Sequence, residues 1–322
     1  MFSNMLLKRI ILVLVLTHNI PNIACLEYVR CTTNSSNIHP FCLPDSYDKD
    51  IDPDPKPNAP LDIYVHLVIE DIIKINDYDT TVSIRSTIFI GWTDNRIKIL
   101  SNSSKWVNEE EEENWTKLNP NWINYLWLPD VEILNMKQLK IPAFVTEPKG
   151  LELYENKRIW YDFPAELTIT CPLFDYEKYP FDRQVCKIMM GSYQYYASEM
   201  KFKGSVIYKA QNQRPLQYKI MNVKKIDEND SIASENEYWL TKDGTIESDD
   251  YNYSRFVVVI ELERSIQQHI MRTYLPTSLF VMSSWIGFFI DIGAIPGRIT
   301  LSVTMLLVLT QIRYENCFKI VI

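Results

Sequence analysis

The stretch CPLFDYEKYPFDRQVC, residues 171–186, is the most informative part of this chain of 322 residues. Cys171 and Cys186 can close a short covalent ring, which carries an aromatic–Pro–apolar–Asp unit from Tyr179 to Asp182. Because proline fixes its own backbone and restricts the residue before it, the tip is stiff as well as closed. A stiff apolar tip with one carboxylate suits pressing on another surface better than catalysis. An ordinary hairpin disulfide in a secreted β-domain is the alternative reading.

The N-terminus indicates entry into the secretory pathway. Lys8 and Arg9 precede an apolar run from Ile10 to Leu16, and a small residue follows at Ala24. This pattern predicts a signal peptide over residues 1–24, because the apolar run is too short to span a bilayer. The formal net charge of -8 argues against nucleic acid as a partner, since binding to phosphates needs a basic patch.

Secretion makes disulfides and glycans chemically reasonable. Cys171 and Cys186 are the most plausible pair, and Cys31 and Cys42 form a second short loop near the start. Sequons for N-glycosylation all precede residue 265, as expected if the upstream part is lumenal. They are Asn34, Asn102, Asn114, Asn229 and Asn252.

Residues 60–265 read as short strands separated by polar turns. LDIYVHLVIEDI and TVSIRSTIFIGW alternate apolar and polar positions, and RFVVVIELER is rich in β-branched residues. This pattern predicts a mainly β fold, an extracellular antiparallel β-sandwich over residues 25–265. The acidic runs at 108–114 and 227–237 are more typical of solvated loops than of a cation site.

The chain then changes character and predicts two transmembrane α-helices. The first is expected over 266–290, where TYLPTSLFVMSSWIGFFI carries no charge. The second is expected over 297–315, and residues 316–322 form a divergent tail. The linker between them is too short for a domain, and Arg298 at its end favours a cytoplasmic turn. We therefore expect a multi-pass plasma-membrane protein with an extracellular N-terminal domain.

The second predicted span has one semi-polar face. Thr300, Thr304, Leu307 and Gln311 recur at helical spacing and share that face. Threonines in membrane helices often serve helix packing alone. A neighbouring charge at Arg298 favours a functional role, because charges beside the membrane are costly. A ring of such helices would give a pore with a cationic mouth, hydroxyls and an apolar gate.

Here the chain resembles the anion-selective members of the Cys-loop (pentameric) ligand-gated ion channels. The residues that carry the resemblance are Tyr274-Leu275-Pro276-Thr277, Ser284-Trp285, Pro296-Gly297-Arg298 and the 171–186 loop, which is one residue longer than usual before Tyr179. Gly297 stands where cation-selective relatives carry a glutamate, and it resembles an invertebrate branch with pH- and zinc-responsive chloride channels. The resemblance implies a homo- or hetero-pentamer that conducts chloride, with Leu307 as the gate and Thr300 and Thr304 below it.

The upstream half resembles the receptor sandwich at Trp92-Thr93-Asp94-Asn95-Arg96, at Trp127-Leu128-Pro129-Asp130 and at Gly191-Ser192-Tyr193-Gln194-Tyr195. In the family such aromatics form a cage at the subunit interface for a cationic or zwitterionic ligand. The resemblance assigns ligand binding to Tyr193, Tyr195 and Tyr253. With 19 tyrosines in the chain, packing is the alternative role for each of them.

Several positions depart from the family pattern. Phe89 and Pro164 stand where receptors for amino acids carry arginines, and Glu132 stands where several relatives carry an aromatic. Without those guanidinium groups a ligand carboxylate loses its charged hydrogen bonds. We therefore expect a small-molecule or ionic ligand other than an amino acid: an amine, a proton or a metal ion. His39, His66 and His269 lack the spacing of metal ligands, and we predict no metal site and no cofactor.

By the same resemblance, Asp77, Asp182 and Arg264 match the charges that couple the ligand-binding domain to the pore. An arginine partly buried between two carboxylates is costly to break on one side and so could link the motions of two domains. Three unrelated surface charges are the alternative.

The family has four membrane helices, and this sequence contains two of them. A truncated gene model or short splice form is the expectation favoured over a functional two-helix channel. The first functional hypothesis is a subunit of a ligand-gated chloride channel. The alternative is a non-conducting, ligand-binding or dominant-negative truncated receptor. The absence of a nucleophile–base pair or phosphate loop in the sequence argues against an enzyme.

Overall fold

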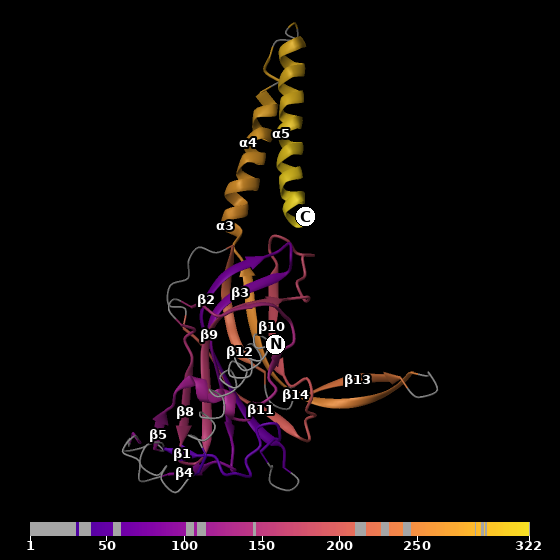
Figure 1. Cartoon of the computed structure of the whole chain (residues 1–322). Helices are drawn as coiled ribbons and strands as arrows, with labels where there is room; N and C mark the ends of the chain where they lie inside the picture. Colours follow the sequence, from indigo (N-terminus) through magenta and orange to yellow (C-terminus); the bar gives the residue numbers. More distant parts are fainter. Residues whose placement is uncertain are drawn as a thin grey trace, which may run out of the picture.

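The computed structural model shows a β-sandwich that continues at one end into a pair of helices (Figure 1). It describes residues 30–31, 40–53, 59–100, 106–107, 114–143, 146–209, 217–226, 232–240, 246–286, 288–290, 293 and 295–321. The predicted signal peptide lies outside these residues, and so do the sequons Asn34, Asn102 and Asn229. Of the two acidic runs, only Asn114 and residues 232–237 are included.

One face of the sandwich is a seven-stranded sheet in the order β11-β2-β3-β9-β8-β5, with β7 also paired to β9. Its long central strands come from the alternating segments: in β2 the side chains of Ile63, Val65, Leu67 and Ile69 are all buried, and the residues between them are more exposed. The strands are β2 (Leu61–Asn76), β3 (Thr81–Thr93), β5 (Trp115–Lys117), β7 (Met136–Lys140), β8 (Gly150–Tyr154), β9 (Arg158–Thr170) and β11 (Met200–Tyr208).

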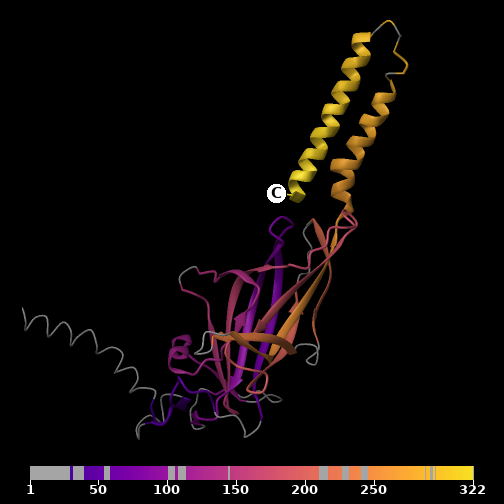
Figure 2. The ribbon, with the colours of Figure 1, turned by 90° about the vertical axis from the view of Figure 1, so that its right-hand side faces the viewer.

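The other face is a five-stranded sheet in the order β12-β14-β10-β6, with β13 paired to the outer part of β14. In Figure 2 the two layers face one another, and Figure 1 shows the β13–β14 hairpin projecting from the sandwich. The strands are β6 (Glu132–Ile133), β10 (Arg183–Gly191), β12 (Tyr218–Lys225), β13 (Ile232–Leu240) and β14 (Ile246–Arg264). A small pair, β1 (Phe41–Cys42) with β4 (Lys98–Ile99), and one 3-10 turn, η2 (Pro120–Tyr125), complete the domain.

The predicted antiparallel sandwich needs one correction. β11 runs parallel to β2 over nine paired residues, from Met200 opposite Leu61 to Tyr208 opposite Ile69. The chain reaches β11 by crossing from the end of β10 in the other sheet. A crossover between sheets allows a parallel pairing that a hairpin does not.

Both predicted disulfides are present, Cys31–Cys42 and Cys171–Cys186. Cys171 follows β9 of one sheet and Cys186 lies in β10 of the other, so the second bond ties the two layers together. Both of its cysteines are fully buried in the core. The ring is therefore more than a hairpin staple within one sheet.

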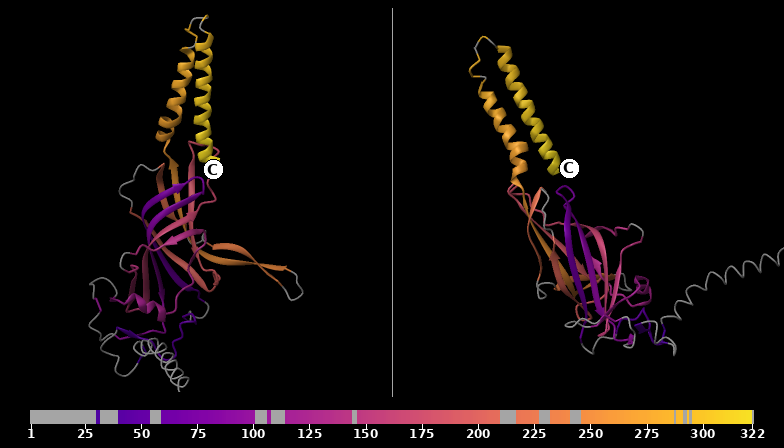
Figure 3. Two further views of the ribbon diagram at one scale, coloured as in Figure 1. Left: turned by 45° about the horizontal axis from the view of Figure 1, so that its top comes forward. Right: turned by 90° about the vertical axis from the view of Figure 1, so that its left-hand side faces the viewer.

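Two helical segments follow β14, and Figure 3 shows them side by side beyond the end of the sandwich. The first consists of α3 (Ile266–His269), a π-helical turn η4 (Ile270–Tyr274) and α4 (Leu275–Ile286). It ends at Ile286 rather than at residue 290, because the amides of Phe288 and Phe289 bond three residues back in turns.

The second helix, α5 (Ile295–Val321), begins before residue 297 and continues through the predicted tail. Pro296 lies in its first turn, where a missing amide costs nothing. RYENCFKIV carries neither glycine nor proline to stop the helix. Within the part of the chain that the structure describes, none of the helices is both long enough and apolar enough to cross a membrane.

Candidate functional site

The end of the sandwich nearest the helices carries a buried charge cluster around Arg264. Arg264 is the last residue of β14, and its side chain is 2% exposed. Its Nε and Nη2 donate to the two oxygens of Asp182 at 2.6 and 2.9 Å, and its Nη1 donates to Asp77 at 2.6 Å. One guanidinium thus joins the β2–β3 turn, the 171–186 loop and the chain entering α3.

Two neutral side chains complete the hydrogen bonding of this cluster. Tyr218 accepts from Arg264 Nη2 and donates to Asp77 Oδ1 at 2.5 Å, and Gln184 Nε2 donates to Asp182 Oδ2 at 2.5 Å. Tyr218 faces Arg264 because the two residues are register partners in β12 and β14. A buried ion pair is favourable only when its remaining polar atoms are satisfied in this way.

The pKa values reflect this balance. Burial by itself would raise the pKa of Asp182, but hydrogen bonds from Arg264 and Gln184 outweigh it and hold that pKa below the ordinary value. Burial raises the pKa of Tyr218, and its hydrogen bond to Asp77 raises it further. Asp182 is therefore ionised and Tyr218 protonated at neutral pH.

The three charges singled out in the sequence are thus in direct contact, and none of them is an isolated surface charge. Tyr218 and Gln184 were not predicted as members of this cluster, because no motif in the sequence pointed to them. The loop tip also touches the helices. The Tyr179 hydroxyl lies 3.1 Å from His269 Nδ1, while Phe181 is 64% exposed.

A second candidate site lies at the edge of the five-stranded sheet, in the turn after β10. Asp130 organises this turn, since its Oδ2 accepts from the Ser192 hydroxyl and from the amides of Tyr193 and Gln194, all at 2.8–2.9 Å. The turn directs Tyr193 outward, where it is 79% exposed. The Trp-Leu-Pro-Asp landmark and the predicted binding segment are therefore one structural unit.

The other predicted ligand residues differ in exposure. Tyr195 is half-buried against the core, and Glu132 is exposed and lies opposite Gly191. Tyr253 is only 4% exposed, with its ring 5.3 Å from that of Tyr196. Tyr253 is thus packed within the chain instead of lying open at the surface.

Phe89 is not brought together with these residues. It lies in β3 of the other sheet, opposite His66 and Asp162. Pro164, in the neighbouring β9, lies opposite Thr87.

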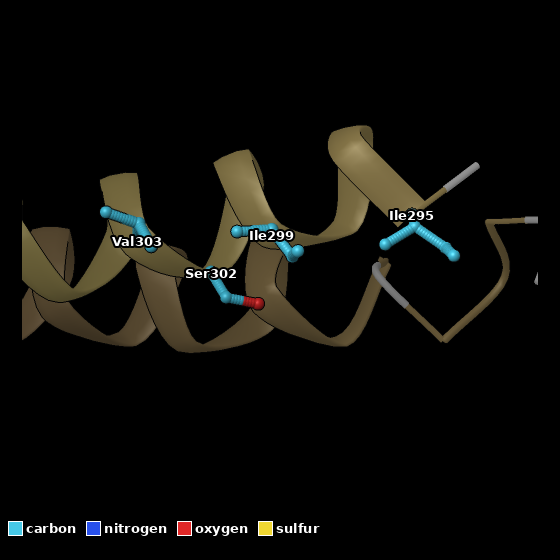
Figure 4. A pocket seen from close by; sticks show the side chains of 4 residues that line it. All are labelled: Ile295, Ile299, Ser302 and Val303. Carbon is cyan, nitrogen blue, oxygen red and sulfur yellow. The ribbon is translucent and has the colours of Figure 1, made fainter.

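The predicted pore residues lie along α5. The hydroxyls of Thr300 and Thr304 donate to carbonyls of their own helix, at 2.8 Å to Pro296 and 2.5 Å to Thr300. Leu307 is 63% exposed, and Gln311 is exposed too. Of Arg298 only the backbone, in the first turn, is described. Figure 4 shows a shallow hollow beside this turn, lined by Ile295, Ile299, Ser302 and Val303.

Of the sequons, two fall on described residues. The amide of Asn114 donates to Glu155 Oε2 at 2.7 Å, and Asn252 is exposed. Both lie on the β-domain, and whether they carry glycans stays a prediction.

A two-layer β-domain with an inter-sheet disulfide loop, joined to helices through a buried arginine, defines a receptor-type ligand-binding domain. The family model for the neurotransmitter-gated ion-channel ligand binding domain matches residues 42–266. The chain belongs to this family, which consists of receptors and not of enzymes.

Curated relatives agree with this assignment. The chain is 30% identical over 210 residues to glycine receptor subunit beta-type 4 of Caenorhabditis elegans, covering 64% of this chain and 41% of the relative. It is 25% identical to gamma-aminobutyric acid receptor subunit pi of Bos taurus (80% and 55% covered) and 24% identical to a glutamate-gated chloride channel of Drosophila melanogaster (78% and 50% covered). The chain spans about half the length of the curated relatives it matches.

Proposed function

We propose that this chain is a subunit of an extracellular ligand-gated chloride channel. In this proposal a ligand binds at the interface between subunits, and the β-domain passes the signal to the helices. The named relatives are subunits for glycine or gamma-aminobutyric acid and a chloride channel gated by glutamate, which favours an anion as the conducted ion.

The observation that carries the proposal is the Arg264 cluster. It is the place where the β-domain meets the helices, and it connects three segments far apart in the sequence through one buried guanidinium. Moving any one of these segments would leave a buried charge without its partner, which is strongly unfavourable. Displacements in the β-domain and in the first helix are therefore coupled energetically.

The membrane part of the proposal rests on the two helical segments. We propose that residues 266–290 and 297–315 form the first two of the membrane helices, with Arg298, Thr300, Thr304 and Leu307 facing the ion path. Support comes from the uncharged stretches within them, residues 273–290 and 299–312, and from their antiparallel course. In the assembly we propose, copies of this chain or related subunits form a pentamer in the plasma membrane, with the β-domain outside and the signal peptide removed.

The ligand in this proposal is a small molecule or ion other than an amino acid. Phe89 and Pro164 carry no guanidinium group. At these two positions of the seven-stranded sheet, a ligand carboxylate would therefore have no partner for a bidentate hydrogen bond. Tyr193 on one subunit and Phe89 on its neighbour supply the aromatic contacts.

Expression in oocytes tests the proposal. The chain is expressed alone and together with a full-length subunit of the family, and currents are recorded during application of amines, zinc and acid. A current that requires this chain supports the proposal. No current alone, with suppression of the partner's current, would instead assign this product a non-conducting, interfering role.

A further inference from the structure

Arg255 occupies an unusual place in the candidate ligand site. It lies on β14 opposite Gly191 of β10, and the residue is only 5% exposed. Its Nη1 donates to the carbonyl of Ser192 at 2.8 Å, which links β14 to the turn that presents Tyr193. The guanidinium of Arg255 thus lies directly beside the turn of the candidate ligand site.

Gly191 makes this place available. A Cβ at residue 191 would overlap Nη1 of Arg255 and would lie 2.7 Å from its Cδ, closer than real Cβ atoms approach. The arginine therefore fills space that a side chain would take at almost any other residue. Gly191 is needed here for close approach and not for a special backbone angle.

The guanidinium also covers the ring of Tyr253. Its Cζ lies 4.7 Å from the ring centroid, inside the range of about 6 Å over which a cation is attracted to an aromatic face. Tyr196 packs against the same tyrosine at 5.3 Å, which leaves Tyr253 4% exposed. The aromatic surface that the sequence suggested for a cationic ligand is already occupied by the chain's own cation.

We propose that Arg255 is the specificity-determining residue of this site and excludes positively charged ligand groups from the Tyr253 ring. A second cation would have to displace the guanidinium or approach it against like-charge repulsion. The group that approaches Tyr253 is therefore neutral or negatively charged. This inference rests on the proposed ligand site. It departs from the expectation of an amine or a metal ion, because it limits the ligand group at this position to a neutral or negatively charged one.

A pair of isosteric probes tests the inference without any current measurement. Choline and 3,3-dimethylbutan-1-ol have the same shape and differ by one positive charge. Their binding to the purified full chain is compared by saturation-transfer NMR for wild type, Arg255→Gln and Arg255→Lys. We expect Arg255→Gln to shift the preference toward choline by about threefold to thirtyfold, the usual value of a cation on an aromatic ring. Arg255→Lys keeps the charge and should retain the wild-type preference.

An unchanged preference in Arg255→Gln, or an equal shift in Arg255→Lys, would overturn the inference. Gly191→Ala provides a second route if Arg255→Gln fails to fold, because the new methyl group displaces the guanidinium and should cause the same shift. Its failure to do so would also count against the proposal. Binding is measured on purified protein, so a lack of current in oocytes leaves this result unaffected and bears only on the proposed channel function.

Discussion

Replacing Asp182 by asparagine should destabilise the β-domain strongly. The carboxylate is 2% exposed and accepts three hydrogen bonds, two from Arg264 and one from Gln184. Removing one partner of a buried ion pair costs about 3–5 kcal/mol, because the other charge stays buried without compensation. Arg264 keeps Asp77, so we expect the lower end, about 3 kcal/mol.

The adjacent pair of residues offers a matched control. Arg183 and Glu263 are neighbours of this pair, 3.1 Å apart, but their side chains are 73% and 37% exposed. An exposed pair is worth about 1 kcal/mol or less. Glu263→Gln should therefore change the free energy of unfolding only slightly, although it removes the same kind of interaction.

Urea unfolding of the full chain in detergent, followed by tryptophan fluorescence, measures both variants. The midpoint should fall for Asp182→Asn while the slope stays constant. Because the folded pKa of Asp182 is lowered, its contribution is present above about pH 4 and is lost as the pH falls through the folded value. The reasoning is refuted if Asp182→Asn costs no more than Glu263→Gln at pH 7.

Three further outcomes follow from the structure. Gly204→Ala should destabilise the chain by more than about 1 kcal/mol in urea, because its φ is +140° and a Cβ would overlap the Val65 carbonyl; Gly297→Ala, with open space around it, should not. Burial and nearby positive charge lower the pKa of His66, so its protonation does not affect stability above about pH 6.5 and destabilises the fold increasingly as the pH falls from there toward the folded value; His66→Gln should flatten that part of the urea–pH profile. Burial raises the pKa of Tyr218, so stability should fall above about pH 10, and the difference in absorbance at 295 nm between wild type and Tyr218→Phe should show its ionisation only with unfolding.

Much of the fold was predictable because its signals are local. The alternating segments became β2 and β3, and the β-branched segment became the inner part of β14. Both disulfides joined cysteines that are near in sequence. Each of these features depends on spacing that can be read along a few residues.

Features that depend on strand register were not predictable in this way. Tyr218 joins the Arg264 cluster only because β12 pairs with the end of β14. The parallel pairing of β11 with β2 follows from a crossover between sheets. Helix boundaries shifted for a different reason, since the transition from Ile286 into turns depends on backbone bonds that the apolar composition does not specify.

In the candidate ligand site, too, some features follow from local sequence and others depend on how the strands pair. The segment around Tyr193 was singled out by its resemblance to a binding segment, and its hydrogen bonds to Asp130 explain how the two sequence landmarks come together. The burial of Tyr253 under Arg255 was not foreseen, because it depends on a glycine in a neighbouring strand. A tyrosine at the expected position is therefore not by itself evidence of an exposed binding surface.

The reversal potential of a ligand-evoked current tests the central proposal most directly. The chain is expressed in oocytes, alone or with a full-length subunit of the family, and external chloride is replaced by an impermeant anion. We predict that a current requiring this chain reverses at a potential that moves by about 59 mV per tenfold change in chloride, as expected for a monovalent ion. A reversal potential that does not change with external chloride but shifts with external sodium would contradict the proposal.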